Sequence, residues 1–217
     1  MNNELEIQRD FWNKEADAFE RIYSHEKSRV STFLDQVFRK DMYQRFVFTI
    51  KNCAPVEGRS FLDVGCGNGL YSFELANQGA GKVVGLDISP VMIDRCVKSA
   101  SRLGLNDRVT FIQTDLLEYT NDSQFDVSYG IGLFDYISDP LPVLRRMREL
   151  TRSKAIMAFP RPWTWRAPIR KMRLTMKGCP VFFYSKARVD SLMKVAGFSR
   201  WEVVKVGKLH CVVAHVN

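Results

Sequence analysis

The segment that most constrains the fold is the run from Phe61 to Leu70, in which an apolar stretch meets a glycine-rich turn. Its sequence is FLDVGCGNGL, so that glycines stand at the alternate positions 65, 67 and 69. Glycine tolerates left-handed backbone conformations and lets the main chain approach a ligand where a Cβ would block it. A helix that begins after such a turn directs its free N–H groups at that ligand. The run therefore predicts a strand, a tight turn and a helix that together bind a nucleotide-like ligand.

Short apolar stretches alternate with helical patterns on either side of this turn. We predict strands over residues 60–65, 82–87, 108–113, 125–130 and 154–159, and helices over 69–78, 89–103 and 139–152. Strands that alternate with helices indicate right-handed βαβ units and a mostly parallel sheet. A further helix over 185–197 and an antiparallel hairpin of strands 200–206 and 209–216 close the chain. The predicted fold class is α/β, with a seven-stranded sheet whose last strand is antiparallel.

The segments that lie outside this alternation of strands and helices indicate how the chain is divided into an arm, a main domain and an insertion. Residues 1–57 carry an amphipathic helical pattern over 4–23 and a second helical stretch, rich in Phe, Tyr and Leu, over about 31–50, and they are interpreted as an N-terminal helical arm or lid. Residues 58–217 form the main domain, and 160–184 are an insertion rich in proline, bases and aromatics. The arm either packs on the sheet or covers a ligand.

Charge is distributed unevenly along a chain whose formal net charge is +8. Residues 1–144 hold 15 Lys/Arg and 21 Asp/Glu, a net of −6, and residues 145–217 hold 17 and 3, a net of +14. The basic third either meets an anionic partner or is a solvated face. No long apolar run or leader-like start is visible, and the five scattered cysteines form no metal-binding or disulfide pattern. A cytoplasmic protein without a metal is therefore expected, and peripheral membrane contact stays open.

Three further features belong with the glycine turn. Asp87 ends the second predicted strand, Asp115 follows the third, and Phe125-Asp126-Val127 begins the fourth. The carboxyl ends of parallel strands meet at one edge of the sheet, where a carboxylate can accept hydrogen bonds from ribose hydroxyls. The turn reads GxGxG, whereas the dinucleotide fingerprint GxGxxG needs its third glycine one residue later, which argues against a dehydrogenase.

In these features the chain resembles the class I S-adenosylmethionine-dependent methyltransferases, closely over about residues 58–160. The resemblance implies a Rossmann-like fold and S-adenosyl-L-methionine as the cofactor. It implies that the turn holds the methionine part, that the second strand end holds the ribose, and that the third holds the adenine. The cofactor-binding residues implied are Asp63, Gly65, Cys66, Gly67, Gly69, Asp87, Ile88, Met92, Asp115, Leu116, Tyr129 and Gly130, with Tyr23, Trp12 or Phe19 of the arm near the sulfonium.

The resembled family has no universal catalytic motif, because the cofactor carries the activated methyl group. The candidates are Asp135 and Tyr136 after the fourth strand and His210 in the hairpin as a base. Each has an alternative: Asp135 caps a turn, Tyr136 is packed, and His210 is structural. The N-P-P-Y signature of amino methyltransferases is absent, which makes a nucleic-acid acceptor less favoured.

Residues 160–177 are predicted to shape the acceptor site, with six bases, no acids and two tryptophans. The candidate substrate-binding residues are Arg161, Trp163, Trp165 and Arg166. The segment from Ala167 onward either lies on a membrane surface as a helix, or the insertion clamps the carboxylates or phosphates of an amphipathic acceptor through Arg161 or Arg166. The alternative is a packed lid helix with a solvated basic side.

The function indicated is O- or N-methylation of a small or amphipathic, anionic molecule. The layout resembles the magnesium-protoporphyrin methyltransferases in outline, and a lipid-linked anionic acceptor also suits the basic insertion. An RNA methyltransferase and a non-catalytic cofactor-binding protein are the alternatives.

Overall fold

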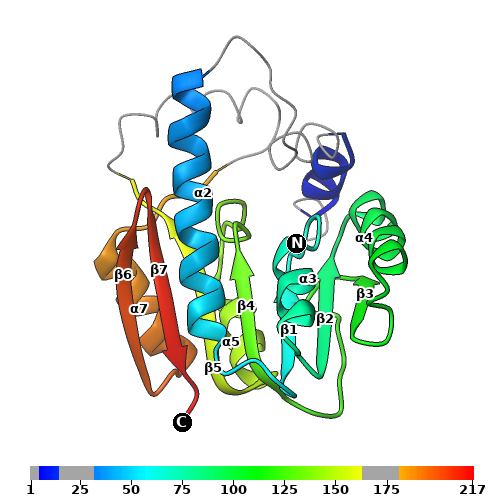
Figure 1. Cartoon of the computed structure of the whole chain (residues 1–217). Coiled ribbons are helices and arrows are strands. Elements are labelled where there is room, and N and C mark those ends of the chain that lie inside the picture. Colours follow the sequence, from blue (N-terminus) through cyan, green and yellow to red (C-terminus); the bar gives the residue numbers. More distant parts are fainter. Residues whose placement is uncertain (1–4, 15–31, 163–180) are drawn as a thin grey trace.

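The computed structural model describes residues 5–14, 32–162 and 181–217. The described residues form one seven-stranded sheet of order β3-β2-β1-β4-β5-β7-β6 (Figure 1). Strands β1 to β5 pair in parallel, and β7 pairs antiparallel with both β5 and β6. The strands are β1 Ser60–Val64, β2 Lys82–Asp87, β3 Val109–Gln113, β4 Phe125–Ile131, β5 Thr151–Pro160, β6 Arg200–Val206 and β7 Leu209–His215. The α/β fold class, with an antiparallel last strand, is confirmed.

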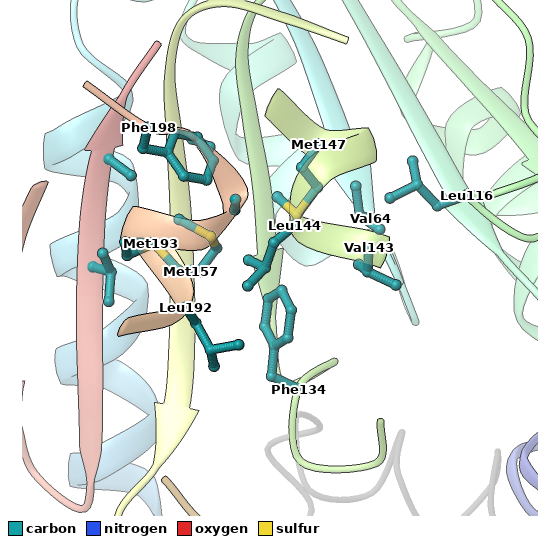
Figure 2. Packing of buried hydrophobic residues seen from close by; sticks show 14 of the residues in the cluster. Val64, Leu116, Phe134, Val143, Leu144, Met147, Met157, Leu192, Met193 and Phe198 are labelled. Carbon is teal, nitrogen blue, oxygen red and sulfur yellow. The ribbon is translucent and has the colours of Figure 1, made fainter. Parts of the chain in front are cut away.

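Helices cover both faces of the sheet (Figure 1). They are α2 Thr32–Cys53, α3 Leu70–Asn77, α4 Pro90–Leu103, α5 Leu141–Glu149 and α7 Lys186–Ala196, and a short helix spans residues 5–14. Since side chains alternate between the faces of a strand, Phe61 enters the core under α2 to α4, and Leu62 enters the core under α5 and α7. Figure 2 shows the second core, where Leu144 of α5 and Met193 of α7 lie beside Met157 of β5.

Local sequence explains where the helices begin and end. The Ser89 side chain accepts the Met92 N–H at 3.2 Å and caps α4, whose first residue is Pro90. Gly104 and Gly197 end α4 and α7 with φ of 68° and 87°, as left-handed C-terminal residues. These chemical signals place the boundaries of both helices close to those predicted.

The boundary between α5 and β5 differs from the prediction of a helix to residue 152. The helix ends at Glu149, and β5 already begins at Thr151. The Thr151 side chain is fully buried and lies 2.6 Å from Ser128 of β4, and Thr151 pairs with Phe125. Pairing with β4 therefore overrides the local helical pattern.

At the N-terminus, the predicted helix 4–23 is described only over residues 5–14. The predicted helix 31–50 extends three residues further, to Cys53. No helix in the described ranges is both long and apolar enough to cross a bilayer.

Candidate cofactor site

The glycine turn follows β1, a central strand that has β2 on one side and β4 on the other. This is the topological switch point, at which open α/β sheets bind ligands. Gly65, Gly67 and Gly69 have φ of 71°, 54° and 75°, all in the left-handed region. The Gly65 and Cys66 N–H groups both donate to the Leu86 carbonyl, at 2.8 and 2.9 Å. The turn is thus fixed to the end of β2.

Gly69 is required by packing behind the turn as well as by its φ. A Cβ on Gly69 would lie 2.8 Å from the Phe73 ring and 3.1 Å from the Cys96 sulfur. The Cys96 thiol also donates to the Gly67 carbonyl at 3.2 Å. Side chains of α3 and α4 therefore pack against one side of the turn.

Asp87 connects the turn to the start of α4. Its Oδ2 accepts the Gly67 N–H and its Oδ1 accepts the Ser89 N–H, both at 2.9 Å. Burial raises the pKa of this carboxyl, and the backbone hydrogen bonds oppose the shift. Each carboxylate oxygen has a further lone pair, so that the group can also accept two ribose hydroxyls.

Asp63 lies directly before the turn and is 2% exposed. The Ser72 hydroxyl of α3 donates to its Oδ2 at 2.7 Å, and the Tyr129 hydroxyl of β4 lies 3.5 Å from Ser72. Burial, together with the negative charge of Asp87, raises the pKa of Asp63 to about 7, although bonds from Ser72 and Tyr129 oppose the shift. Sequence reasoning missed Ser72, for which only its place in the first turn of the helix is a signal.

The ends of β2 and β3 are joined at the position predicted for the adenine. The Thr114 N–H donates to the Asp87 carbonyl at 3.1 Å, and Asp115 Oδ1 accepts the Leu117 N–H at 2.6 Å. Asp115 and Ile88 are half-buried, whereas Leu116 is buried in the core. Met92 is buried beneath the start of α4. Tyr129 and Gly130 are also buried, and the Tyr129 ring has no exposed surface.

The charge of this edge of the sheet decides what ligand it suits. The N-terminus of α3 would by itself favour an anion. Asp87 lies beside it, however, and like-charge repulsion from this carboxylate disfavours a phosphate. The donor and acceptor groups instead suit hydroxyls, an amine and a positive charge. S-adenosylmethionine has all three, so the residues present fit this cofactor.

The helix of residues 5–14 bridges two loops at the same edge. The Ser89 hydroxyl donates to Asn13 Oδ1 at 2.7 Å, and Gln8 Nε2 donates to the Tyr136 carbonyl at 2.6 Å. The rings of Phe11 and Trp12 lie against Tyr136, with the Trp12 centroid 5.1 Å away. One short helix thereby joins the loop after β2 to the loop after β4 (Figure 1). Gln8 and Asn13 carry no sequence signal for these contacts.

The predicted catalytic residues fall into two groups. Asp135 and Tyr136 lie in the loop after β4; Asp135 is 5% exposed, and its carbonyl accepts the Phe182 N–H at 2.9 Å. His210 of β7 pairs with Phe159 of β5. Two strands, β4 and β5, separate β7 from β1, or about 14 Å of sheet. A role for His210 therefore requires an acceptor that spans this width.

Basic groups gather at the carboxyl ends of β4 and β5, opposite the acids. Burial lowers the pKa of His210, and the positive charges of Arg161 and Lys186 lower it further. Arg161 Nη1 donates to the Gly207 carbonyl at 3.3 Å. Arg45 Nη1 of α2 lies 3.6 Å from where a Cβ would stand on Gly132. Sequence reasoning missed Arg45, since nothing in its neighbourhood marks it. Tyr23, Trp163, Trp165 and Arg166 lie outside the described residues.

A model of the methyltransferase domain matches residues 55–197, most of the chain. The chain therefore belongs to the methyltransferase-domain family and has the class I fold, whose cofactor is S-adenosylmethionine. Among solved structures, the magnesium protoporphyrin IX methyltransferase of Synechocystis PCC 6803, crystallised with bound SAH, is similar in fold. Its TM-score is 0.79 at 21% identity, with 98% of this chain and 99% of that chain covered.

Curated relatives match over part of their length. The mitochondrial ubiquinone biosynthesis O-methyltransferase of Dictyostelium discoideum is 31% identical over 152 residues, 66% of this chain and 46% of that protein. A tRNA U34 carboxymethyltransferase of Saccharophagus degradans is 28% identical over 104 residues, 48% of this chain and 32% of that protein. The chain thus spans less than half of these relatives' length.

Proposed function

We propose that this protein transfers the methyl group of S-adenosylmethionine to an oxygen or nitrogen of a small or amphipathic, anionic molecule. The observation that carries the proposal is the division of charge along the sheet edge. Asp63 and Asp87 lie at the ends of β1 and β2 and Asp115 follows β3, whereas Arg45 and Arg161 lie at the ends of β4 and β5. The acidic side suits a cationic donor, and the basic side suits an anionic acceptor.

The cofactor, when bound, supplies an activated methyl group on sulfur, and the protein aligns the acceptor and excludes water. Asp87 would hold the ribose, Asp115 the adenine, and the glycine turn with Asp63 the methionine part. The helix of residues 5–14 would cover the site through Asn13 and Gln8. Since Tyr136 contacts this helix through its carbonyl and its ring, Tyr136 and its neighbour Asp135 remain the candidates that face the acceptor.

The experiment is methyl transfer from isotopically labelled S-adenosylmethionine to a cell extract, followed by mass spectrometry of small molecules, lipids and RNA. We expect a labelled small or amphipathic acid. The Arg45→Gln variant should raise the KM for this acceptor about 10-fold or more, because a charged hydrogen bond is lost. Its affinity for S-adenosylmethionine should be unchanged. Binding of the cofactor without any labelled product would instead favour a non-catalytic binding protein, and absence of cofactor binding would overturn the proposal.

RNA is the second candidate acceptor, since one group of relatives carries a tRNA-modifying name and the last 73 residues carry a net +14. A label recovered in RNA would support this candidate.

A further inference from the structure

A row of three paired residues crosses the strands β5, β7 and β6 near the edge of the sheet that carries the glycine turn. His210 of β7 pairs with Phe159 of β5 on one side and with Lys205 of β6 on the other. The side chains of directly opposed residues project from the same face, with Cβ atoms about 4.5–5.5 Å apart. Phe159 belongs to the core under α5 and α7, so His210 and Lys205 project from this face as well. A half-buried histidine and an exposed lysine therefore lie side by side.

Arg161 lies beside this row. It follows β5, and its N–H donates to the Lys208 carbonyl at 3.0 Å, which continues the pairing of β5 with β7. Arg161 is two residues beyond Phe159, so the alternation of side chains places it on the same face as His210. Its Nη1 donates at 3.3 Å to the Gly207 carbonyl, in the turn between β6 and β7. The half-buried arginine is thus held next to His210.

The first residue of α7 brings a fourth base to the same place. The Tyr184 N–H donates to the Pro160 carbonyl at 2.8 Å and fixes the start of α7 to the end of β5. Lys186 follows two residues later, and its positive charge acts on His210, as that of Arg161 does. These four bases, here called the basic cluster, are Arg161, Lys186, Lys205 and His210.

The acid beside the basic cluster is already occupied. Among the described residues, the acid that acts on His210 is Asp190. Its Oδ2 accepts from Lys186 Nζ at 2.8 Å, and its Oδ1 accepts from Trp201 Nε1 at 2.9 Å. A single carboxylate does not offset four bases. Like charges repel one another more strongly at half-buried positions than on an open surface, because water screens them less. An anion that enters the cluster removes this repulsion.

We propose that the basic cluster binds one carboxylate or phosphate group of the acceptor. The planar guanidinium of Arg161 offers N–H donors to such a group, the two lysines offer point charges, and a protonated His210 offers a further N–H. The inference rests on the proposed function, and it adds a length to the acceptor. Two strand spacings separate β7 from β4 and three separate it from β1, which is about 10 Å and about 14 Å. The acceptor is therefore elongated, with its anionic group about 10 Å or more from the methylated atom.

The test is an NMR pH titration of the histidine imidazoles in sodium sulfate, sodium acetate and sodium chloride at equal ionic strength. Sulfate stands for a phosphate group and acetate for a carboxylate, and the larger response identifies which of them the cluster prefers. Relative to chloride, we expect the preferred anion to raise the pKa of His210 by about 1, because a bound anion favours the imidazolium. The control is His215 of the same strand, which pairs with Lys154 and Arg200 at the opposite edge of the sheet and should not respond. Equal responses of the two histidines, or none of His210, would overturn the inference.

Matched variants connect the response to the basic cluster. Arg161→Gln should remove most of the effect of the anion on His210, because the guanidinium is lost. Arg200→Gln, which removes the arginine beside His215, should leave that effect unchanged. Lys205→Gln alters an exposed position and should weaken the effect without disturbing the fold. An effect that stays at full size in Lys205→Gln overturns the inference even if Arg161→Gln does not fold.

Kinetics with the labelled acceptor separate this inference from the proposed function. Lys205→Gln should raise the KM for the acceptor about 3-fold or more, because a charged contact is lost, and should leave the affinity for S-adenosylmethionine unchanged. A response of His210 to anions together with an unchanged KM would assign the cluster to a free anion, and the inference would fall while the proposed function stands. Absence of any labelled product would overturn the proposed function, and with it the assignment of the anion to an acceptor.

Discussion

At the scale of single residues, Asp87 connects the loops around the glycine turn. One carboxylate accepts from the turn after β1 and from the start of α4. Its backbone carbonyl also receives the Thr114 N–H after β3. Asp87, at the end of β2, thus connects the loops that follow β1, β2 and β3. Its side chain links the loops that flank the ligand, so it is expected to affect binding more than stability.

We predict that Asp87→Ala weakens S-adenosylmethionine binding by about 1–3 kcal/mol, because ribose hydroxyls and the Gly67 N–H lose their acceptor. Isothermal titration calorimetry measures the change. The matched control is Asp94→Ala, on the exposed surface of α4, where the carboxylate pairs with Lys98. An unchanged affinity in Asp87→Ala would contradict the placement of the ribose.

Asp63 makes a separate prediction about stability. Its native pKa, about 7, lies above the usual value of 3.8, so the folded state holds this proton more tightly than the unfolded state. The resulting stabilisation is present below about pH 4 and is lost as pH rises through 7. In urea unfolding of the ligand-free protein, the free energy of unfolding should fall by a few kcal/mol between about pH 4 and pH 7 because Asp63 ionises. The Asp63→Asn variant should lack this contribution. A pH profile parallel to that of the unaltered protein would refute the assignment.

Gly85 of β2 is required by close packing, although its φ is ordinary. A Cβ there would lie 2.6 Å from the Phe111 ring and 3.1 Å from the Cys66 Cβ. We predict that Gly85→Ala destabilises the protein by about 1–3 kcal/mol through overpacking. Thermal unfolding measures the loss, and the double variant Gly85→Ala/Phe111→Leu should recover part of it. If the second change recovers nothing, the Phe111 contact is not the cause.

At the scale of elements, the helix of residues 5–14 stands apart because it packs on loops rather than on the sheet. Its buried Phe11 contacts Val181, which lies near the end of the insertion, and its Trp12 ring lies against Tyr136. The helix thereby touches the loop after β2, the loop after β4 and the end of the insertion. Such a position suits a cover that joins donor and acceptor.

We predict that the double variant Gln8→Ala/Asn13→Ala weakens S-adenosylmethionine binding by about 1–2 kcal/mol, since each lost hydrogen bond contributes about 0.5–1.5 kcal/mol. Global stability should change little, because neither residue belongs to the main cores. The control is Arg9→Ala, an exposed position on the same helix. Unaltered affinity in the double variant, measured by calorimetry, would show that the helix does not act on the donor.

At the scale of the whole molecule, the two sides of the sheet edge differ in charge. The acids lie at the ends of β1 to β3, and the bases Arg45 and Arg161 lie at the ends of β4 and β5. Along the chain, residues 1–144 carry a net −6 and residues 145–217 a net +14. Chain order becomes spatial order in the sheet, because β1, β2 and β3 build one half of it and β4 to β7 build the other half.

This division predicts different salt responses for the two candidate acceptors. RNA held by several phosphates should bind with a steep salt dependence, since each phosphate contact adds to the slope. A small acid bound by one or two bases should show a shallow one. The KM for the labelled acceptor, measured between about 50 and 200 mM salt, distinguishes them. A steep slope would favour the RNA candidate.

The sequence by itself determined the sheet, the glycine turn and the caps of α4 and α7. These features are local: a strand pattern, a left-handed glycine or a capping serine acts within a few residues. The carboxylates Asp87 and Asp115 were also recognisable, because the end of a parallel strand marks its edge of the sheet. The C-terminal end of α5 could not be predicted from the sequence, because the burial of Thr151 against β4 determines it.

Only the tertiary structure decided which side chains act together. Ser72 reaches Asp63 from the next helix, Arg45 approaches Gly132 from 87 residues earlier in the chain, and Asn13 meets Ser89 across 76 positions. None of these contacts has a spacing that periodicity can reveal. The burial that raises the pKa of Asp63 likewise arises from elements packed together. The carboxylates at the strand ends follow from the chain order, whereas the contact of Ser72 with Asp63 and the contacts of the helix of residues 5–14 with two loops arise only from long-range packing.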